Sequence, residues 1–61
     1  MSFFTIEEYK SKYGVDVANW QIEIACEMIY SQVGVSYRNP NWNSDSTPIA
    51  IKNASMEQLR F

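Results

Sequence analysis

The stretch from Val17 to Val33, VANWQIEIACEMIYSQV, constrains the fold more than any other part of this sequence. It is long and apolar enough to form the central element of a small domain. On a helical wheel its apolar residues fall into two arcs instead of one. The first arc comprises Ala18, Ile22, Ala25, Cys26, Ile29 and Val33, and the second comprises Val17, Trp20, Ile24 and Met28. A helix with two apolar faces needs two packing partners.

The length of the chain limits its stability. A chain of 61 residues forms one domain at most, and it buries only about 60% of the surface that its unfolded form exposes. At about 0.05 to 0.15 kcal/mol per residue, the free energy of unfolding is about 3 to 9 kcal/mol. Disulfides, a metal or oligomerisation usually support such small domains. With one cysteine and no histidine, the first two are not expected, so neighbouring subunits or further chain should complete the core.

Composition favours a globular cytoplasmic protein over other classes. The sequence is 46% hydrophobic with a net charge of -2, which predicts a folded chain without a basic face for nucleic acid. The first ten residues, MSFFTIEEYK, lack the features of a signal peptide, and no run approaches a membrane span,. We therefore expect neither a nucleic-acid partner nor a membrane partner.

The first predicted helix has a clear start. Thr5 followed three residues later by Glu8 forms a capping box, in which each side chain satisfies a backbone N–H of the other residue,. Phe4 and Tyr9 are placed to pack across this cap as a hydrophobic staple,. These signals predict a short helix over about 6–13.

A second, long central helix is predicted over about 17–33. Gly14 ends the first helix in a left-handed conformation, Asp16 is expected to cap the second, and Gly34 is expected to end it,. Because the connection between the two helices is short, the first helix should cover one of the two apolar arcs.

An irregular loop is predicted over 35–46, where VSYRNPNWNSDS contains three asparagines and a proline without periodicity,. Tyr37 and Trp42 are its expected anchors. Two interpretations remain open for these aromatic side chains: they fold back onto the core and hold the loop, or they bind a partner.

The third predicted helix covers about 48–61. Thr47 is its expected N-cap, and Pro48 follows at the first helical position, where a missing N–H costs nothing,. No capping residue follows before Phe61, which predicts a helix that is cut in the middle. The fold class expected from the whole sequence is thus all-α, a small three-helix bundle that forms a single domain and is truncated within its third helix.

No catalytic or metal centre is predicted. Cys26 lies in the first apolar arc without a histidine to activate it, so we expect a core residue,. Glu23 and Glu27, four residues apart, have three possible roles: a solvated helix face, ion pairs with Lys or Arg of another subunit, or metal and acid–base chemistry. The sequence therefore predicts a non-enzymatic protein without a cofactor.

The order of these elements resembles a known protein family. The opening MSFFTIEEYKSKYG, the helix NWQIEIACEMIYSQVG, the irregular loop and the final TPIAIKNASMEQLRF are similar to the head-completion adaptor proteins of long-tailed bacteriophages, also called head–tail connectors. Pro48, Ala54, Glu57 and Gln58 match the pattern with which the third helix of that family begins and continues.

The resemblance implies a structural virion assembly protein of a phage or prophage. Such a protein forms a homo-oligomeric ring of about twelve copies beneath the portal protein, extends the DNA channel, and binds a tail or stopper protein. It is found in the cytoplasm of the bacterial host during assembly and then at the head–tail junction of the virion. This chain would be the N-terminal part of a longer connector protein.

Interface residues are predicted on the second apolar arc, in the acidic pair beside it and in the loop. They are Trp20, Glu23, Ile24, Glu27, Met28, Tyr37, Arg38 and Trp42. In an isolated monomer, the third helix could instead cover the apolar members of this set. The alternative function is a small cytoplasmic interaction or regulatory module, whose helices form a groove for a partner peptide lined by Met28, Met56 and the loop aromatics. An acidic DNA-binding helix-turn-helix is disfavoured by the charge.

Overall fold

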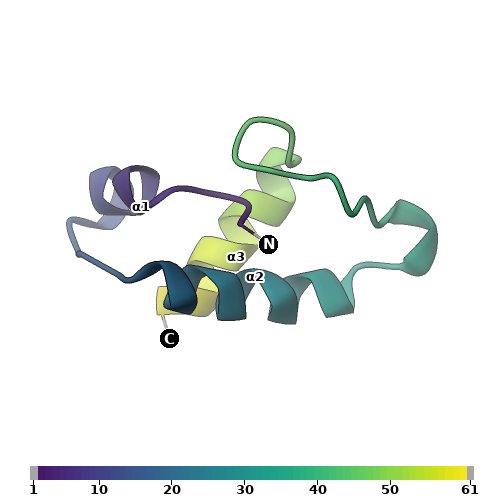
Figure 1. Cartoon of the computed structure of the whole chain (residues 1–61), viewed down its shortest axis with the longest axis horizontal. Coiled ribbons are helices and arrows are strands. Elements are labelled where there is room, and N and C mark those ends of the chain that lie inside the picture. The colour runs from purple at the N-terminus through teal and green to yellow at the C-terminus, as the bar shows by residue number, and fades with distance from the viewer. Residues whose placement is uncertain (1, 61) are drawn as a thin grey trace.

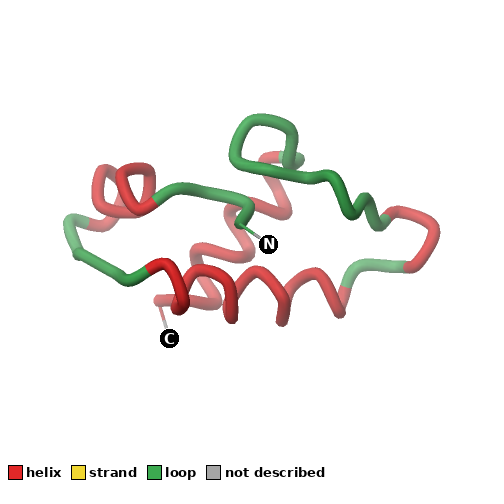
Figure 2. The backbone as a smooth tube through the Cα atoms, in the orientation of Figure 1, coloured by secondary structure: helices red, strands yellow, loops and turns green. Residues whose placement is uncertain are grey.

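The chain folds into a small all-α bundle of three helices. The structure, a computed structural model, describes residues 2–60, and no strand occurs among them (Figure 2). This confirms the predicted fold class. The elements in chain order are α1 (Ile6–Tyr13), α2 (Asn19–Gln32), a 3₁₀ turn η1 (Val35–Tyr37) and α3 (Ile49–Arg60).

The main helix–helix contact is between α2 and α3. In Figure 1, α2 runs along one long side of the molecule and α3 crosses behind it. The N-terminal segment passes above α2 in this view before it enters α1, so this segment and α3 lie on the same, inner side of α2. The loop after η1 returns above the helices to the start of α3, so both ends of the loop are fixed by the bundle.

The predicted ends of α1 are confirmed. The Glu8 N–H donates to Thr5 Oγ1 at 3.0 Å, and the Thr5 N–H donates to Glu8 Oε1 at 3.1 Å, which together form the capping box. Gly14 has the left-handed φ of 70°, and its N–H donates to the Lys10 carbonyl at 2.7 Å. A side chain with a Cβ would be strained at this φ, which is why glycine ends the helix here.

The predicted cap of α2 is wrong. Asp16 pairs instead with Lys10, at 3.1 Å on the surface. Val17 packs against the core, and Ala18 is extended, with φ -92° and ψ 155°. The helix therefore begins two residues later than expected, and the Ala18 N–H donates to Gln21 Oε1 at 2.9 Å. Because Val17 packs against the core and Ala18 is extended, the chain is not yet helical at the positions that Asp16 would have to cap.

The end of α2 also differs from the prediction. Gly34 is not left-handed, with φ -57° and ψ 140°, and so does not stop the helix in the expected way. The guanidinium of Arg38 binds carbonyl groups at this end of the helix instead. Its Nε donates to the Val33 carbonyl and its Nη2 donates to the Ser31 carbonyl, both at 2.9 Å. Carbonyls at a helix end lack intrahelical partners, so Arg38 has a structural role here.

The start of α3 is shifted by one residue from the prediction. The Thr47 hydroxyl donates to the Asn43 carbonyl at 2.6 Å and so secures the end of the loop. The Pro48 carbonyl accepts the first helical hydrogen bond, from the Lys52 N–H at 3.0 Å. Pro48 is therefore the residue that precedes the helix. The predicted last residue of this helix, Phe61, lies outside the described residues.

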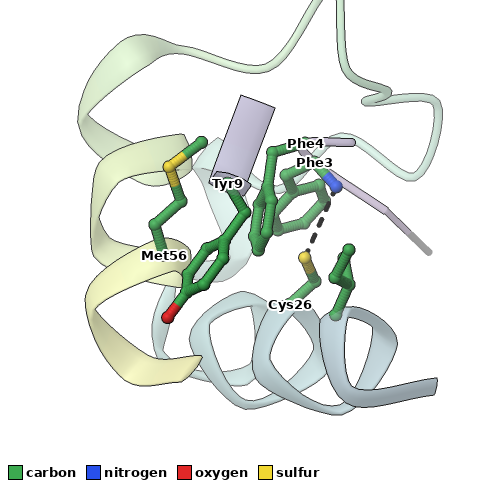
Figure 3. Close-up of a cluster of buried hydrophobic side chains, with 6 residues drawn as sticks. Phe3, Phe4, Tyr9, Cys26 and Met56 are labelled. Carbon is green, nitrogen blue, oxygen red and sulfur yellow. Dashed lines mark hydrogen bonds between the residues drawn. The ribbon is translucent and has the colours of Figure 1, made fainter. Parts of the chain in front are cut away.

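The core is centred on the inner face of α2, and the N-terminal segment fills it (Figure 3). The Phe3 side chain is fully buried, and its backbone N–H donates to Cys26 Sγ at 3.4 Å. Phe4 and Tyr9 stack with their ring centroids 6.0 Å apart, as the staple predicts. The first apolar arc of α2 is thus covered jointly by this segment, by α1 and by α3. The buried cluster comprises Phe3, Phe4, Tyr9, Ile22, Cys26 and Met56.

A single lysine joins α1, the loop and α3. Lys52 Nζ donates to Glu8 Oε2 at 2.9 Å and to the Ser44 carbonyl at 2.7 Å, and its side chain is largely buried. Partial burial raises the pKa of Glu8, but the hydrogen bonds from Lys52 and from the Thr5 N–H, together with the Lys52 charge, outweigh it. The net effect is a pKa below the ordinary value, which favours the ionised pair.

Candidate interaction surface

The second apolar arc of α2 is open to solvent. Trp20, Ile24 and Met28 are 63%, 50% and 43% exposed. Residues spaced four apart lie along one side of a helix, so the three side chains form a continuous strip, here called the α2 outer face. The interpretation in which the third helix covers them is wrong, because α3 packs against the inner face, where Ile22 and Cys26 are buried.

A shallow groove runs beside the α2 outer face. It has a volume of about 200 Å³, and the far wall is provided by Gln58 and Leu59 near the end of α3. The Gln58 side-chain nitrogen approaches Met28 Sδ at 3.8 Å, which is a weak contact. Exposed apolar side chains next to an apolar hollow are typical of a surface that receives a partner side chain.

Acidic side chains border this surface. Glu23 and Glu27 are both exposed, and the helical period places them on one flank of the α2 outer face. The sequence of α2, NWQIEIACEMIYSQ, contains no Lys or Arg. The exposed side of this helix is therefore apolar along its middle and negative along one flank.

The predicted loop anchors separate into two kinds. Trp42 is half-buried and packs edge-to-face on Phe3 and Tyr30, with ring centroids 5.9 and 6.1 Å apart. Its anchoring role is confirmed. Tyr37 is 77% exposed, so the same prediction is wrong for Tyr37. The reason is that Tyr37 ends the short η1 turn, which projects away from the core before the chain returns.

A second hollow, here called the loop groove, lies between the end of α2, the loop and the start of α3. Its volume is about 700 Å³. The sequence did not predict it, because its walls come from three segments that no local pattern connects. It shares no lining residue with the groove beside the α2 outer face. The lining residues are Ile29, Gln32, Val33, Tyr37, Trp42, Pro48, Ala50, Ile51 and Ala54.

The predicted interface residues thus occupy two surfaces. Trp20, Ile24 and Met28 line the groove beside α2, whereas Tyr37 and Trp42 line the loop groove. The predicted single groove that would combine Met28, Met56 and the loop aromatics is not formed. Met56 is 3% exposed and belongs to the core.

Reactive and metal-binding groups do not gather at either surface. Burial raises the pKa of the Cys26 thiol, although the hydrogen bond from the Phe3 N–H acts in the opposite direction. This thiol is both fully buried and largely protonated at neutral pH,. Among residues 2–60, no three His, Cys, Asp or Glu side chains are grouped so as to hold a metal ion. Within the same range, no helix has the length and apolar character needed to cross a bilayer.

Comparisons with known proteins give no information about the function. No family model, no curated protein and no solved structure matches the chain. What the chain does must therefore be inferred from the α2 outer face, its acidic flank and the loop groove.

Proposed function

We propose that this chain is a structural assembly protein that works by binding other proteins, and that it is a head-completion adaptor between the portal vertex of a phage capsid and the tail. The observation that carries the proposal is the α2 outer face, where Trp20, Ile24 and Met28 stay exposed although the inner face of the same helix is buried in the core.

The energetics favour a binding role for this strip. Fully burying one large apolar side chain contributes about 1.5 to 3 kcal/mol, and the fold leaves part of this contribution unused at three neighbouring positions, which are only partly covered. Tryptophan is among the residues most often found at the energetic centre of interfaces. Because the strip lies on a packed helix, it is already ordered before a partner arrives, which lowers the entropic cost of binding.

The order of elements and the pattern of residues support the adaptor assignment. A capped helix, a long central helix, an irregular loop and a helix that follows Pro48 match the layout of the head-completion adaptors that the sequence resembles. In this role the chain would form a ring of about twelve copies, bind the portal protein and a tail or stopper protein, and catalyse no reaction. It would act in the cytoplasm of a bacterial host and remain in the virion.

Gene order and particle composition test this proposal. We expect genes for a portal protein and a major capsid protein upstream of the coding sequence, and we expect the protein in purified tailed particles. Deletion of the gene should give DNA-filled heads and separate tails in electron micrographs. Intact tailed particles without the protein would contradict the proposal.

The loop groove favours a second candidate function, a small regulatory module that binds a partner peptide. Its apolar lining and volume of about 700 Å³ suit an extended or helical segment. Loss of binding to a peptide partner after Tyr37→Ala, with unchanged binding after Ile24→Ser, would favour this module. The adaptor proposal predicts the reverse: Ile24→Ser on the α2 outer face should weaken partner binding, and Tyr37→Ala should leave it unchanged.

A further inference from the structure

We propose that copies of this chain bind one another head to tail, with the α2 outer face of one copy seated in the loop groove of the next. This inference rests on the proposed function, since it takes the α2 outer face to be a protein-binding surface. It adds the identity of the partner, which is a second copy of this chain, and the surface of that copy that is contacted.

The two surfaces complement each other in shape. The α2 outer face is a row of exposed apolar side chains from Trp20 to Met28, about 12 Å long at 1.5 Å per residue. An apolar cavity of about 150 Å³ holds a benzene ring, so the loop groove, at about 700 Å³, has room for the side chains of this row. The groove beside the α2 outer face, at about 200 Å³, has room for only one of them.

The inner wall of the loop groove is the part that we assign to the contact. Ile29, Ile51 and Ala54 line it from two packed helices and are only partly exposed. This wall is therefore ordered before a second copy arrives, which lowers the entropic cost of binding. Tyr37 stands at the rim and is 77% exposed, so Tyr37→Ala should leave the association unchanged.

Opposite charges lie beside the two surfaces. Glu27 is exposed on one flank of the α2 outer face. Arg38 is exposed at the end of α2, where it donates to the carbonyl of Val33, a lining residue of the loop groove. Its other contacts among residues 2–60 are the Ser31 carbonyl and the Tyr30 ring, which are uncharged. Its positive charge thus complements Glu27 of a second copy.

Each copy can use both surfaces at the same time, because the two grooves share no lining residue. A contact between two different patches is heterologous, so every open row of copies keeps one unoccupied strip and one unoccupied groove at its ends. Such a contact adds further copies until a ring closes. A symmetric contact between two α2 outer faces would instead stop at two copies.

Two variants that each remove one surface provide the test. Ile24→Ser takes an apolar side chain from the strip, and Ala50→Trp fills the loop groove from an exposed position. Sedimentation velocity should show that the unchanged chain grows beyond two copies as its concentration rises. Each variant alone should need at least about tenfold higher concentration to reach the same mean mass.

Mixing the two variants should restore one contact. One copy then supplies an intact strip and the other an intact groove, so an equal mixture should form a species of two copies and none larger. Val35→Ser is the matched control, because Val35 is 80% exposed but lies in η1 and lines neither surface. This variant should associate as the unchanged chain does.

A change of charge tests the expected pairing of Glu27 with Arg38. Glu27→Gln should weaken the association about two- to fivefold at low salt, as for an exposed ion pair, and this effect should shrink as salt rises. Glu7→Gln removes an exposed glutamate of α1 that lines neither surface, and it should have no effect. Equal effects of the two changes would overturn this pairing.

The outcomes separate this inference from the proposed function. A mixture that stays monomeric while the unchanged chain associates would overturn the inference, as would undiminished association of Ala50→Trp. Association that stops at two copies and is lost with Ile24→Ser would also overturn it, but the binding role of the α2 outer face would stand. A chain that is monomeric at every concentration overturns the inference alone, since the adaptor role is decided by the composition of tailed particles.

Discussion

The inner and outer faces of α2 are similar in apolar character and opposite in environment. Ile22 on the inner face is 1% exposed, whereas Ile24, two residues later, is 50% exposed. The difference comes from the segments that cover the helix. Phe3, Tyr9 and Met56 converge on the inner face (Figure 3), and no described segment crosses the outer one. Helical periodicity shows which residues share a face, but the rest of the chain decides which face becomes the core.

This division assigns different tasks to the two faces. The inner face contributes the stability of a domain whose free energy of unfolding is only about 3 to 9 kcal/mol. The outer face contributes little to folding, so a partner can bind it without displacing any part of the core. Changes on the two sides should therefore have separable effects on stability and on binding.

The largest expected effect concerns the segment that covers the inner face. Phe3→Ala should destabilise the protein by about 3 to 5 kcal/mol, because it opens a cavity against the rings of Tyr30 and Trp42,. Urea unfolding followed by circular dichroism measures this loss. Tyr37→Ala is the control, since it truncates an aromatic side chain that is exposed, and it should cost less than about 0.5 kcal/mol. A Phe3 variant as stable as the control would show that the N-terminal segment does not support the core.

A medium loss of stability is expected when the ion pair that joins α1, the loop and α3 is broken. Lys52→Met should lower the free energy of unfolding by about 1 to 2 kcal/mol, because Glu8 and the Ser44 carbonyl lose their hydrogen bonds from a largely buried ammonium,. Lys10→Met removes an exposed pair with Asp16 and should cost less than about 0.5 kcal/mol. The same unfolding assay compares the two, and equal losses would contradict the role assigned to Lys52.

The smallest expected effect is a pH dependence from the same pair. The folded-state pKa of Glu8 is lowered, so its contribution to stability is present above the unfolded pKa of about 4.3 and is lost as the pH falls through the lower folded value. Partial exposure of the carboxylate should keep this contribution below about 1 kcal/mol. Unfolding free energies between pH 7 and pH 3 should fall less steeply in Glu8→Gln than in the unchanged chain. Parallel curves would argue against the pair.

The sequence predicted those parts of the fold whose causes are local. The capping box of Thr5 and Glu8 and the left-handed Gly14 define α1 within ten residues, and each acts through its nearest neighbours. The start of α2 was predicted less well. Asp16 found Lys10 as its partner and Val17 was drawn into the core, and both outcomes depend on how α1 packs.

The candidate site was predicted in part for the same reason. Trp20, Ile24 and Met28 share a face because of the helical period alone, and all three remain exposed together in the fold. Arg38 is predicted at an interface, and the structure adds a local role, because its guanidinium binds two carbonyls at the end of α2. The loop groove needs α2, the loop and α3 together, so no pattern within one segment could indicate it. The burial of Phe3, which precedes every periodic element, was not foreseen either.

One pair of substitutions tests the central claim most directly. Ile22→Ala and Ile24→Ala make the same chemical change in the middle of the same helix, so their intrinsic helix propensities cancel. Urea unfolding should show a loss of about 2 to 5 kcal/mol for Ile22→Ala and less than about 0.5 kcal/mol for Ile24→Ala. Equal losses at the two positions would contradict the account, because they would show that the outer face of α2 supports the fold as much as the inner face does.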